Sequence, residues 1–322
     1  MQSLEAYLSI GILILLLGIS LVSTFYLRFV PLRYIFFGFR IALTGLGRED
    51  EGTTLPRTQR AGEINNLRAM FLSGSIQANA AVLLGIPVVV LWGGVSSLIW
   101  VILFGILLAS LRFASGTLAV RYRQKTESGW LGGAQEFLAL TFWGRSGMLV
   151  YVILAIAITL VWGAAVQADL WQNFYKIPAK AKISIKIGEH FFASPSIPLI
   201  MALIGLFLSL GSMRRVARVA AFISPIVSGL LILLSLFIIA QNSAKASQFL
   251  SNAWAHAFHF KSIAAGVLTA LVAFKTIAYT GIVAPEEATG ISSAVTAASI
   301  NDYAVKQGLV SMSAALFYTT IV

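Results

Sequence analysis

Long apolar runs separated by short polar segments dominate the pattern along this chain. Polar positions are scarce over about 20 residues at a time, the length that an α-helix needs to cross a membrane. Apolar and polar residues do not alternate as in a transmembrane barrel, and small residues are interspersed, as in helices that pack closely in lipid. The pattern predicts helices at residues 4–26, 69–91, 98–119, 149–166, 198–210, 219–239, 263–283 and 309–322.

The composition indicates the same class, an all-α polytopic membrane protein. Hydrophobic residues make up 58% of the 322 residues and charged residues 11%, and the mean hydropathy is +0.86. These values exclude a soluble globular domain. The chain has no cysteine, which excludes disulfides and thiolate metal sites.

The net charge of +11 indicates a membrane orientation rather than a nucleic-acid partner. Basic residues gather in alternate loops, which the positive-inside rule places in the cytoplasm, with the N-terminus outside. One longer loop departs from the rule, because four lysines between residues 176 and 186 fall on the outer side. The residues that set the orientation are Arg28, Arg33, Arg40, Arg48, Arg57, Arg60, Arg68, Arg121, Arg123, Lys125, Arg145, Arg214, Arg215 and Arg218.

A few polar side chains fall inside the apolar runs. Gln77 and Asn79 lie deep in the second run, where an amide needs a cavity, another helix or a solute as partner. Lys275 lies well inside the seventh run, and its ammonium either has a functional partner or reaches the interface. Arg112 lies closer to a cytoplasmic end, where snorkelling to the interface is the favoured interpretation.

Catalytic chemistry is not indicated. The sequence has no nucleophile elbow, no phosphate-binding glycine loop and no carboxylate pair at matched depth in two runs. His190, His256 and His259 lie in or near predicted outer loops, where solvated side chains are favoured over metal ligands. The sequence therefore predicts a protein that moves a solute and is not an enzyme.

Spaced motifs across nearly the whole chain resemble the alanine or glycine:cation symporter family. Their order and intervals match without a gap as far as Arg123. The motifs are Leu67-Arg68-Ala69-Met70, Gly93-Gly94, Trp100, Arg112-Phe113-Ala114, Val120-Arg121-Tyr122-Arg123, Gly132-Gly133, Gly163 with Gln167, Gly211 to Pro225, Gly281 with Pro285-Glu286-Glu287-Ala288, and Val305-Lys306-Gln307-Gly308-Leu309.

The resemblance implies a LeuT-type fold in the cell inner membrane, in which two inverted five-helix repeats surround a site at the midplane. Residues 1–27 would form an extra N-terminal helix and residues 28–68 a basic cytoplasmic loop. Residues 69–262 would form the first repeat and residues 263–322 the start of the second. The last run is too short to cross the hydrocarbon, so the second repeat is expected to be incomplete.

The resemblance also implies the site, at the broken first helix of each repeat. Asn79 and Ala81 stand where the family has glycines, and replacing a glycine with alanine favours an unbroken helix by about 1 kcal/mol. Where the coupling-ion site is lost, Lys275 is the candidate replacement for the cation. The implied substrate-binding residues are Gln77, Asn79, Ala80, Gln167 and Thr269, and the implied ion-binding residues are Ala78, Ala81, Lys275 and Glu287.

Two functions remain open at this stage. The preferred one is a secondary active transporter, a symporter of small neutral amino acids such as alanine or glycine, with sodium as coupling ion and no other cofactor. The alternative is a non-transporting membrane subunit that keeps the symporter scaffold within a complex. Expected partners are the amino acid, membrane lipid and, for the alternative, another membrane subunit that completes the bundle; nucleic acid is not expected.

Overall fold

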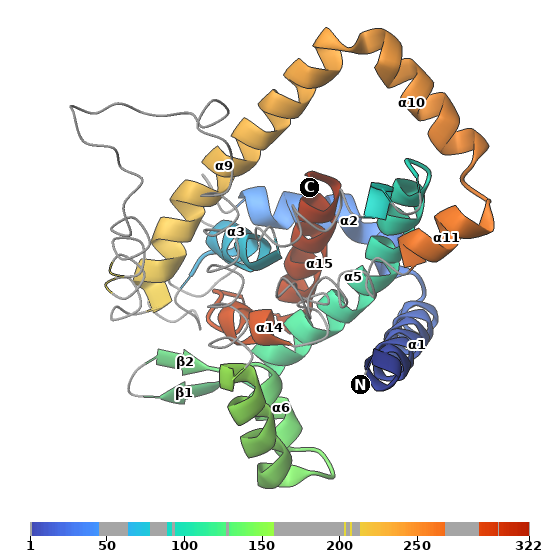
Figure 1. The fold of residues 1–322 in the computed structure, drawn as a ribbon. Coiled ribbons are helices and arrows are strands. Elements are labelled where there is room, and N and C mark those ends of the chain that lie inside the picture. The colour runs from blue at the N-terminus through green and yellow to red at the C-terminus, as the bar shows by residue number, and fades with distance from the viewer. Residues whose placement is uncertain are drawn as a thin grey trace, which may run out of the picture.

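The computed structural model describes residues 2–44, 64–77, 89–91, 94–126, 129–157, 203, 207, 213–267, 290–301 and 303–321, and these are mostly helical (Figure 1). A further helix spans Gly144–Ala157. The labelled elements are α1 (Gln2–Tyr26), α2 (Val30–Thr44), α3 (Asn66–Gln77), α5 (Ser97–Arg121), β1 (Gln124–Thr126), β2 (Gly129–Leu131), α6 (Ala134–Ala139), α9 (Met213–Gln241), α10 (Ser243–Ala255), α11 (Phe260–Val267), α14 (Ile291–Thr296) and α15 (Ala304–Ile321).

Apolar helices of membrane-spanning length confirm the broad fold class. Ser97–Arg121 and Ala221–Gln241 are each long and apolar enough to cross a membrane. Leu17–Tyr26 and Val30–Thr44 together form a third candidate, bent by 77° at the break between them. The helices predicted at residues 4–26, 98–119 and 219–239 are therefore confirmed as helices, and α15 covers the last predicted run.

The bend between α1 and α2 is a Schellman motif. The Phe29 amide donates to the carbonyl oxygen of Thr24 at 3.0 Å, and the Arg28 amide donates to that of Phe25 at 3.0 Å. Arg28 has a φ of 51° and Phe29 a φ of 60°, a left-handed conformation that glycine adopts more readily than other residues. The turn redirects the chain so that α2 lies across one end of the bundle.

Helix α2 lies within the segment that the sequence predicts as a basic loop. Pro31, Gly38 and Ala42 are buried on one face, while Arg33 and Arg40 are exposed. The buried face packs on α15, where the Ser313 hydroxyl donates to the carbonyl oxygen of Ile35 at 2.8 Å. With 15 residues and two arginines, α2 is shorter than a membrane-spanning run, so the apolar pattern alone does not identify it.

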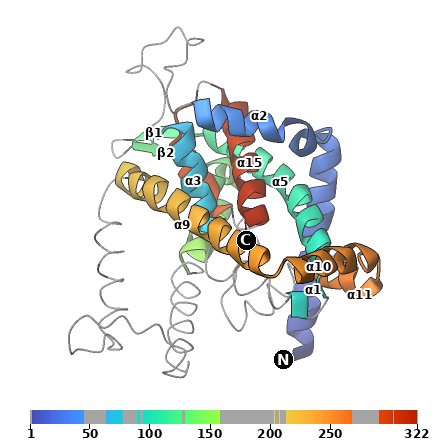
Figure 2. The ribbon, with the colours of Figure 1, turned by 90° about the horizontal axis from the view of Figure 1, so that it is seen from above.

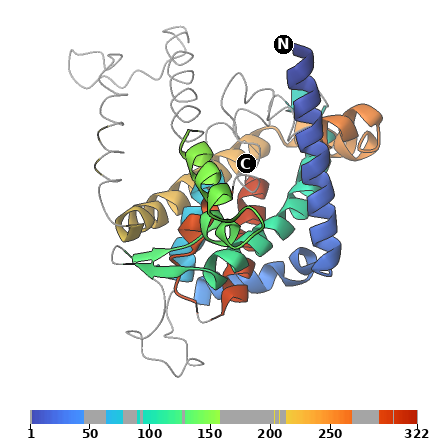
Figure 3. The same ribbon diagram turned by 90° about the horizontal axis from the view of Figure 1, so that it is seen from below.

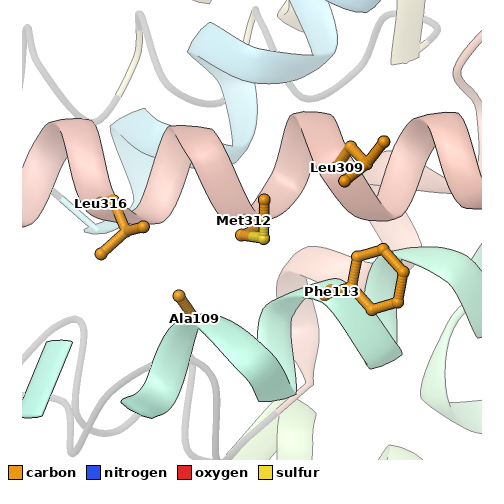
Figure 4. Packing of buried hydrophobic residues seen from close by; sticks show 5 residues of the cluster. All are labelled: Ala109, Phe113, Leu309, Met312 and Leu316. Atoms are coloured by element: carbon orange, nitrogen blue, oxygen red, sulfur yellow. The ribbon is translucent and has the colours of Figure 1, made fainter. Parts of the chain in front are cut away.

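Helix α15 is the centre of the described bundle, surrounded by α2, α3 and α5 (Figure 2). Every residue from 307 to 316 is buried, as expected for a helix without a solvated face. Figure 4 shows its apolar contact with α5, formed by Ala109, Phe113, Leu309, Met312 and Leu316.

Small residues let α5 and α15 approach closely. A Cβ atom added to Gly308 would lie 2.7 Å from the carbonyl oxygen of Phe113, and one added to Gly116 would lie 2.6 Å from Ser311 Oγ. Both distances are too short for real contacts. The two glycines therefore fix the separation of the helices, as small residues do in membrane bundles.

The two ends of α5 carry different structures. The antiparallel strands β1 and β2 follow its C-terminal end, with Lys125 opposite Trp130, and α6 lies beside them (Figure 3). At the N-terminal end, α10 and α11 meet α5, and Trp100 Nε1 donates to the carbonyl oxygen of Ala257 at 2.6 Å. The sequence predicts no element at β1, β2, α6 or α10, while the run predicted at 263–283 overlaps the end of α11.

Candidate functional site: a polar junction between α5, α14 and α15

The residues implied by the family resemblance fall almost entirely outside the described part of the chain. Gln77 is the last residue of α3, so the structure places its backbone. The prediction that these residues form a site stays a prediction. The implied residues that lie outside the described ranges are Ala78, Asn79, Ala80, Ala81, Gln167, Thr269, Lys275 and Glu287.

A buried polar cluster joins the α14–α15 turn to the first turns of α15. Asn301 Nδ2 donates to Ser299 Oγ at 3.0 Å and to Gln307 Oε1 at 2.9 Å. Gln307 Nε2 in turn donates to Ser311 Oγ at 3.1 Å. Ser299 and Gln307 are fully buried, so each hydrogen bond replaces one that water would otherwise make. We call these four residues the amide cluster.

Arg123 anchors the same turn from the end of α5. Its Nη1 donates to the carbonyl oxygens of Ala297 at 2.9 Å and Ser299 at 2.6 Å, and its Nη2 donates to that of Asn301 at 3.3 Å. The guanidinium carbon lies 4.7 Å from the centre of the Trp130 ring, a cation–π distance. Burial lowers the pKa of the Arg123 guanidinium below its ordinary value.

Backbone contacts hold α14 against the segment that follows β2. The Ala134 amide donates to Ser293 Oγ at 2.9 Å. Gly133 has a φ of 110°, and a Cβ atom there would lie 2.6 Å from the Ala294 backbone. Only glycine meets both demands. The Gly132-Gly133 motif of the sequence therefore marks a packing site for α14.

The start of α3 joins the junction through a short parallel bridge between Ile64 and Ser299. The Ile64 amide donates to the carbonyl oxygen of Ala298 at 3.1 Å, and the Ile300 amide donates to that of Ile64 at 2.6 Å. Helix α3 then begins beside it, where the Arg68 amide donates to Asn65 Oδ1 at 2.9 Å, an N-cap bond. The junction thus gathers the ends of α3, α5, α14 and α15.

Two amide oxygens near this junction are buried and make no hydrogen bond within the described residues, Asn66 Oδ1 and Asn301 Oδ1. Each can accept a hydrogen bond or contact a hard cation, which prefers oxygen ligands. Within the same part of the chain, no three His, Asp or Glu side chains gather as metal ligands would. The junction therefore has hydrogen-bonding capacity that the described residues leave unused.

Arg112 corrects one interpretation of the sequence. Its side chain is 2% exposed, and it lies in α5, the helix that packs most extensively against α15. A snorkelling arginine would place its guanidinium at the surface, so that interpretation is wrong. Arg112 is instead buried within the protein and interacts with other groups there. The apolar residues on either side of it in the sequence do not reveal this burial.

The histidines agree with the sequence interpretation where they are described. His256 and His259 are exposed, with His256 Nδ1 lying 3.5 Å from His259 Nε2. His190 lies outside the described residues. The exposure of these two residues agrees with the solvated or interfacial environment expected for them, and the outer location of the segment stays a prediction.

Arg123 and Gln307 are the site residues that sequence reasoning did not assign. Both stand inside motifs that carried the family resemblance, Val120-Arg121-Tyr122-Arg123 and Val305-Lys306-Gln307-Gly308-Leu309. Membership of these motifs is the signal by which the sequence could have identified the two residues. The sequence does not reveal their partners, because Arg123 donates to carbonyl oxygens more than 170 positions away in the chain.

Comparison with known proteins gives a family match over the whole chain. The model of the sodium:alanine symporter family matches residues 1–322. Three relatives from Bacillus subtilis are the uncharacterized transporter YflA, 26% identical over 319 residues, the amino-acid carrier protein AlsT, 21% over 308, and the probable sodium/glutamine symporter GlnT, 23% over 313.

These alignments cover nearly all of this chain but a smaller share of each relative. They include 97%, 96% and 97% of this chain, in the same order, but 62%, 61% and 60% of the relatives. The chain therefore spans about three fifths of the length of the curated relatives that it matches.

Proposed function

The chain belongs to the sodium:alanine symporter family, and on that premise we propose that it is a secondary active transporter that moves small neutral amino acids, such as alanine or glycine, together with a cation. The family match over residues 1–322 is the observation that carries the proposal. Relatives described as an amino-acid carrier and a probable sodium/glutamine symporter support the same class of solute.

The proposed architecture is the LeuT-type bundle in the inner membrane, with the N-terminus outside. In this arrangement α3 and α5 belong to the first repeat, and α14 and α15 to the inverted second repeat. The amide cluster and Arg123 then lie where the two repeats meet, on the side with the basic loops. Buried polar groups between packed helices support this proposal, because such groups in membrane proteins mark solute paths and moving contacts.

The proposed substrate site lies at the end of α3, where Gln77 is followed by Asn79 and Ala80, with Gln167 and Thr269 completing it. The ion-binding positions are Ala78, Ala81, Lys275 and Glu287. Sodium is the proposed coupling ion. If the backbone carbonyls that would bind sodium are not available without the two family glycines, the Lys275 ammonium occupies the position of the sodium ion.

Uptake into proteoliposomes tests the function. Radiolabelled alanine or glycine should accumulate when sodium is higher outside than inside, and accumulation should stop when the gradient is removed by an ionophore. Asn79→Leu should lower uptake at least tenfold, because an apolar side chain offers no hydrogen bond to the substrate. Failure of every amino acid in a broad panel to move would refute the proposal.

One observation favours the second candidate function, a membrane subunit that keeps the scaffold without transporting. Asn79 and Ala81 replace the glycines expected at the helix break, and both favour a continuous helix. Copurification from native membrane separates the two candidates. A stable partner subunit combined with no amino-acid uptake supports the scaffold; uptake by the chain alone refutes it.

A further inference from the structure

A cavity of about 310 Å³ lies at the N-terminal end of α5, where α10 and α11 meet it. Its wall comes from residues 94–96, from the last turn of α10 and from the first turn of α11. The volume is sufficient for a small organic solute with its first waters. The polar side chains that line it are Ser96, Asn252, His256, Lys261 and Ser262.

The wall of this cavity is held by specific contacts. Ser96 is 4% exposed, and its hydroxyl donates to the carbonyl oxygen of Asn252 at 3.3 Å. One turn along α5, Trp100 donates to the Ala257 carbonyl oxygen and its ring meets that of Phe258 edge to face. These contacts hold the backbone of the α10–α11 corner against α5.

The cavity is positive and has no carboxylate from the chain segments that form it. Residues 64–126 and 190–285 contain neither Asp nor Glu. Lys261 contributes a full charge, and the N-terminal ends of α5 and α11 each contribute a partial positive charge. The C-terminal end of α10 contributes an opposite partial charge of about half a unit, which Lys261 outweighs.

The location of the cavity follows from the charges at the two ends of α5. Arg121, Arg123 and Lys125 follow its C-terminal end, which the positive-inside rule assigns to the cytoplasm. The cavity at the opposite end then faces the outside, where a solute arrives before it reaches the middle of the membrane.

We propose that this cavity is an outer reception site for the carboxylate of the incoming amino acid, with Lys261 as the charged partner and Asn252 and His256 as hydrogen-bond donors. The proposal rests on the proposed transport function and adds a binding site distinct from the one at the end of α3. A lipid phosphate presents the same anionic oxygen chemistry, so the experiment separates the two sources.

Uptake kinetics in proteoliposomes of neutral lipid give the first measurement. Lys261→Gln should raise the alanine concentration for half-maximal uptake by about threefold, the size expected for an exposed ion pair, with an unchanged maximal rate. Lys245→Gln is the matched control, because Lys245 is an exposed lysine of α10 that does not line the cavity. Equal kinetics for both variants and the original chain would overturn the reception site while leaving the transport function intact.

Direct binding gives the second measurement, which does not require transport. Equilibrium dialysis with radiolabelled propionate, a carboxylate without an ammonium group, should show weaker binding to Lys261→Gln than to Lys245→Gln in nanodiscs of neutral lipid. This difference supports the site even where no uptake is found. A difference that arises only in nanodiscs containing phosphatidylglycerol would assign Lys261 to a lipid phosphate and overturn the proposal.

Discussion

At the scale of single residues, Arg123 makes several hydrogen bonds to the turn between α14 and α15. It donates to three carbonyl oxygens of one turn and covers Trp130. These oxygens come from backbone that has left α14 and has not entered α15, so helical hydrogen bonds cannot satisfy them. The guanidinium fork, with its five donors, suits several acceptors at once.

Replacement of Arg123 should destabilise the fold. Arg123→Ala should lower the free energy of unfolding by about 3 kcal/mol, because hydrogen bonds to a charged group contribute about 1.5–3 kcal/mol each and the loss is not additive. Arg123→Lys should recover less than half of this, since an ammonium lacks the planar fork. Thermal unfolding in detergent, followed by tryptophan fluorescence, measures both.

The control for this prediction is Arg121→Ala. Arg121 ends α5 and is exposed, so its loss should change the unfolding temperature by less than a third of the Arg123→Ala shift. Equal shifts for the two variants would show that general charge, rather than the carbonyl contacts, stabilises this end of the molecule.

The left-handed turn after α1 gives a second residue-scale prediction. Arg28→Gly should raise the free energy of unfolding by about 1 kcal/mol, because the φ of 51° strains a side-chain-bearing residue and not glycine. Thermal unfolding of the variant measures the change. Arg33→Gly, at an exposed position inside α2, should instead lower stability by up to about 1 kcal/mol; the same sign for both would contradict this account.

At the scale of elements, the crossing of α5 and α15 is set by glycine rather than by large apolar side chains. Phe113, Met312 and Leu316 fill the space beside the crossing, but Gly308 and Gly116 decide how near the backbones come. Because lipid is as apolar as these side chains, close van der Waals packing is the main source of helix association here.

Enlarging Gly308 should therefore separate the helices. Gly308→Val should lower the free energy of unfolding by about 1–3 kcal/mol through overpacking and should also weaken the amide cluster at the neighbouring Gln307. Gly229→Ala is the matched control, because nothing lies within 4 Å of a Cβ atom at that position in α9, and it should be neutral or stabilising. Urea or thermal unfolding of the two variants checks the difference.

How far the sequence predicted these elements depends on their length and polarity. Runs of about 20 apolar residues identified α1, α5 and α9, because few other structures need such runs. Helix α2, helix α10 and the β1–β2 hairpin were not predicted, since their patterns are short or polar. The pairing of α5 with α15 was also out of reach, because neither helix has a polar face that orients it.

The candidate site was less predictable, for a related reason. Gln307 and Arg123 lie in recognisable motifs, but the sequence does not show which groups they contact. Arg123 donates to distant backbone oxygens and Gln307 accepts from the Asn301 amide, and these groups come together only when the chain folds. The snorkelling interpretation of Arg112 was wrong because an apolar stretch of helix looks the same in sequence whether lipid or protein surrounds it. The residues implied at the broken helices remain predictions.

At the scale of the whole molecule, the helix ends that carry basic residues lie on the same side of the structure. The basic C-terminal end of α5 and the basic N-terminal end of α9, with Arg215 and Arg218, lie on the same side of the molecule as the β1–β2 hairpin (Figures 1 and 3). By the positive-inside rule, we propose that this is the cytoplasmic side. The α10–α11 corner lies at the opposite end of both helices.

Cysteine labelling tests this orientation, and the absence of native cysteine makes the experiment direct. In cells, Lys245→Cys in α10 should react with a membrane-impermeant maleimide added outside. Lys125→Cys in β1 should react only after the membrane is permeabilised, because both lysines are exposed but lie on opposite sides. Labelling of both in intact cells, or of Lys125→Cys alone, would reverse or refute the orientation.

The Arg123 anchor also bears on how readily the molecule can change shape. If the chain transports as proposed, a conformational change that moves α14 and α15 away from α5 has to break the contacts of Arg123 with the turn that holds Ala297, Ser299 and Asn301. At about 1.5–3 kcal/mol for one charged hydrogen bond, each contact alters the ratio of the two conformations by about 10- to 150-fold. A single guanidinium can thus determine which conformation the resting molecule occupies.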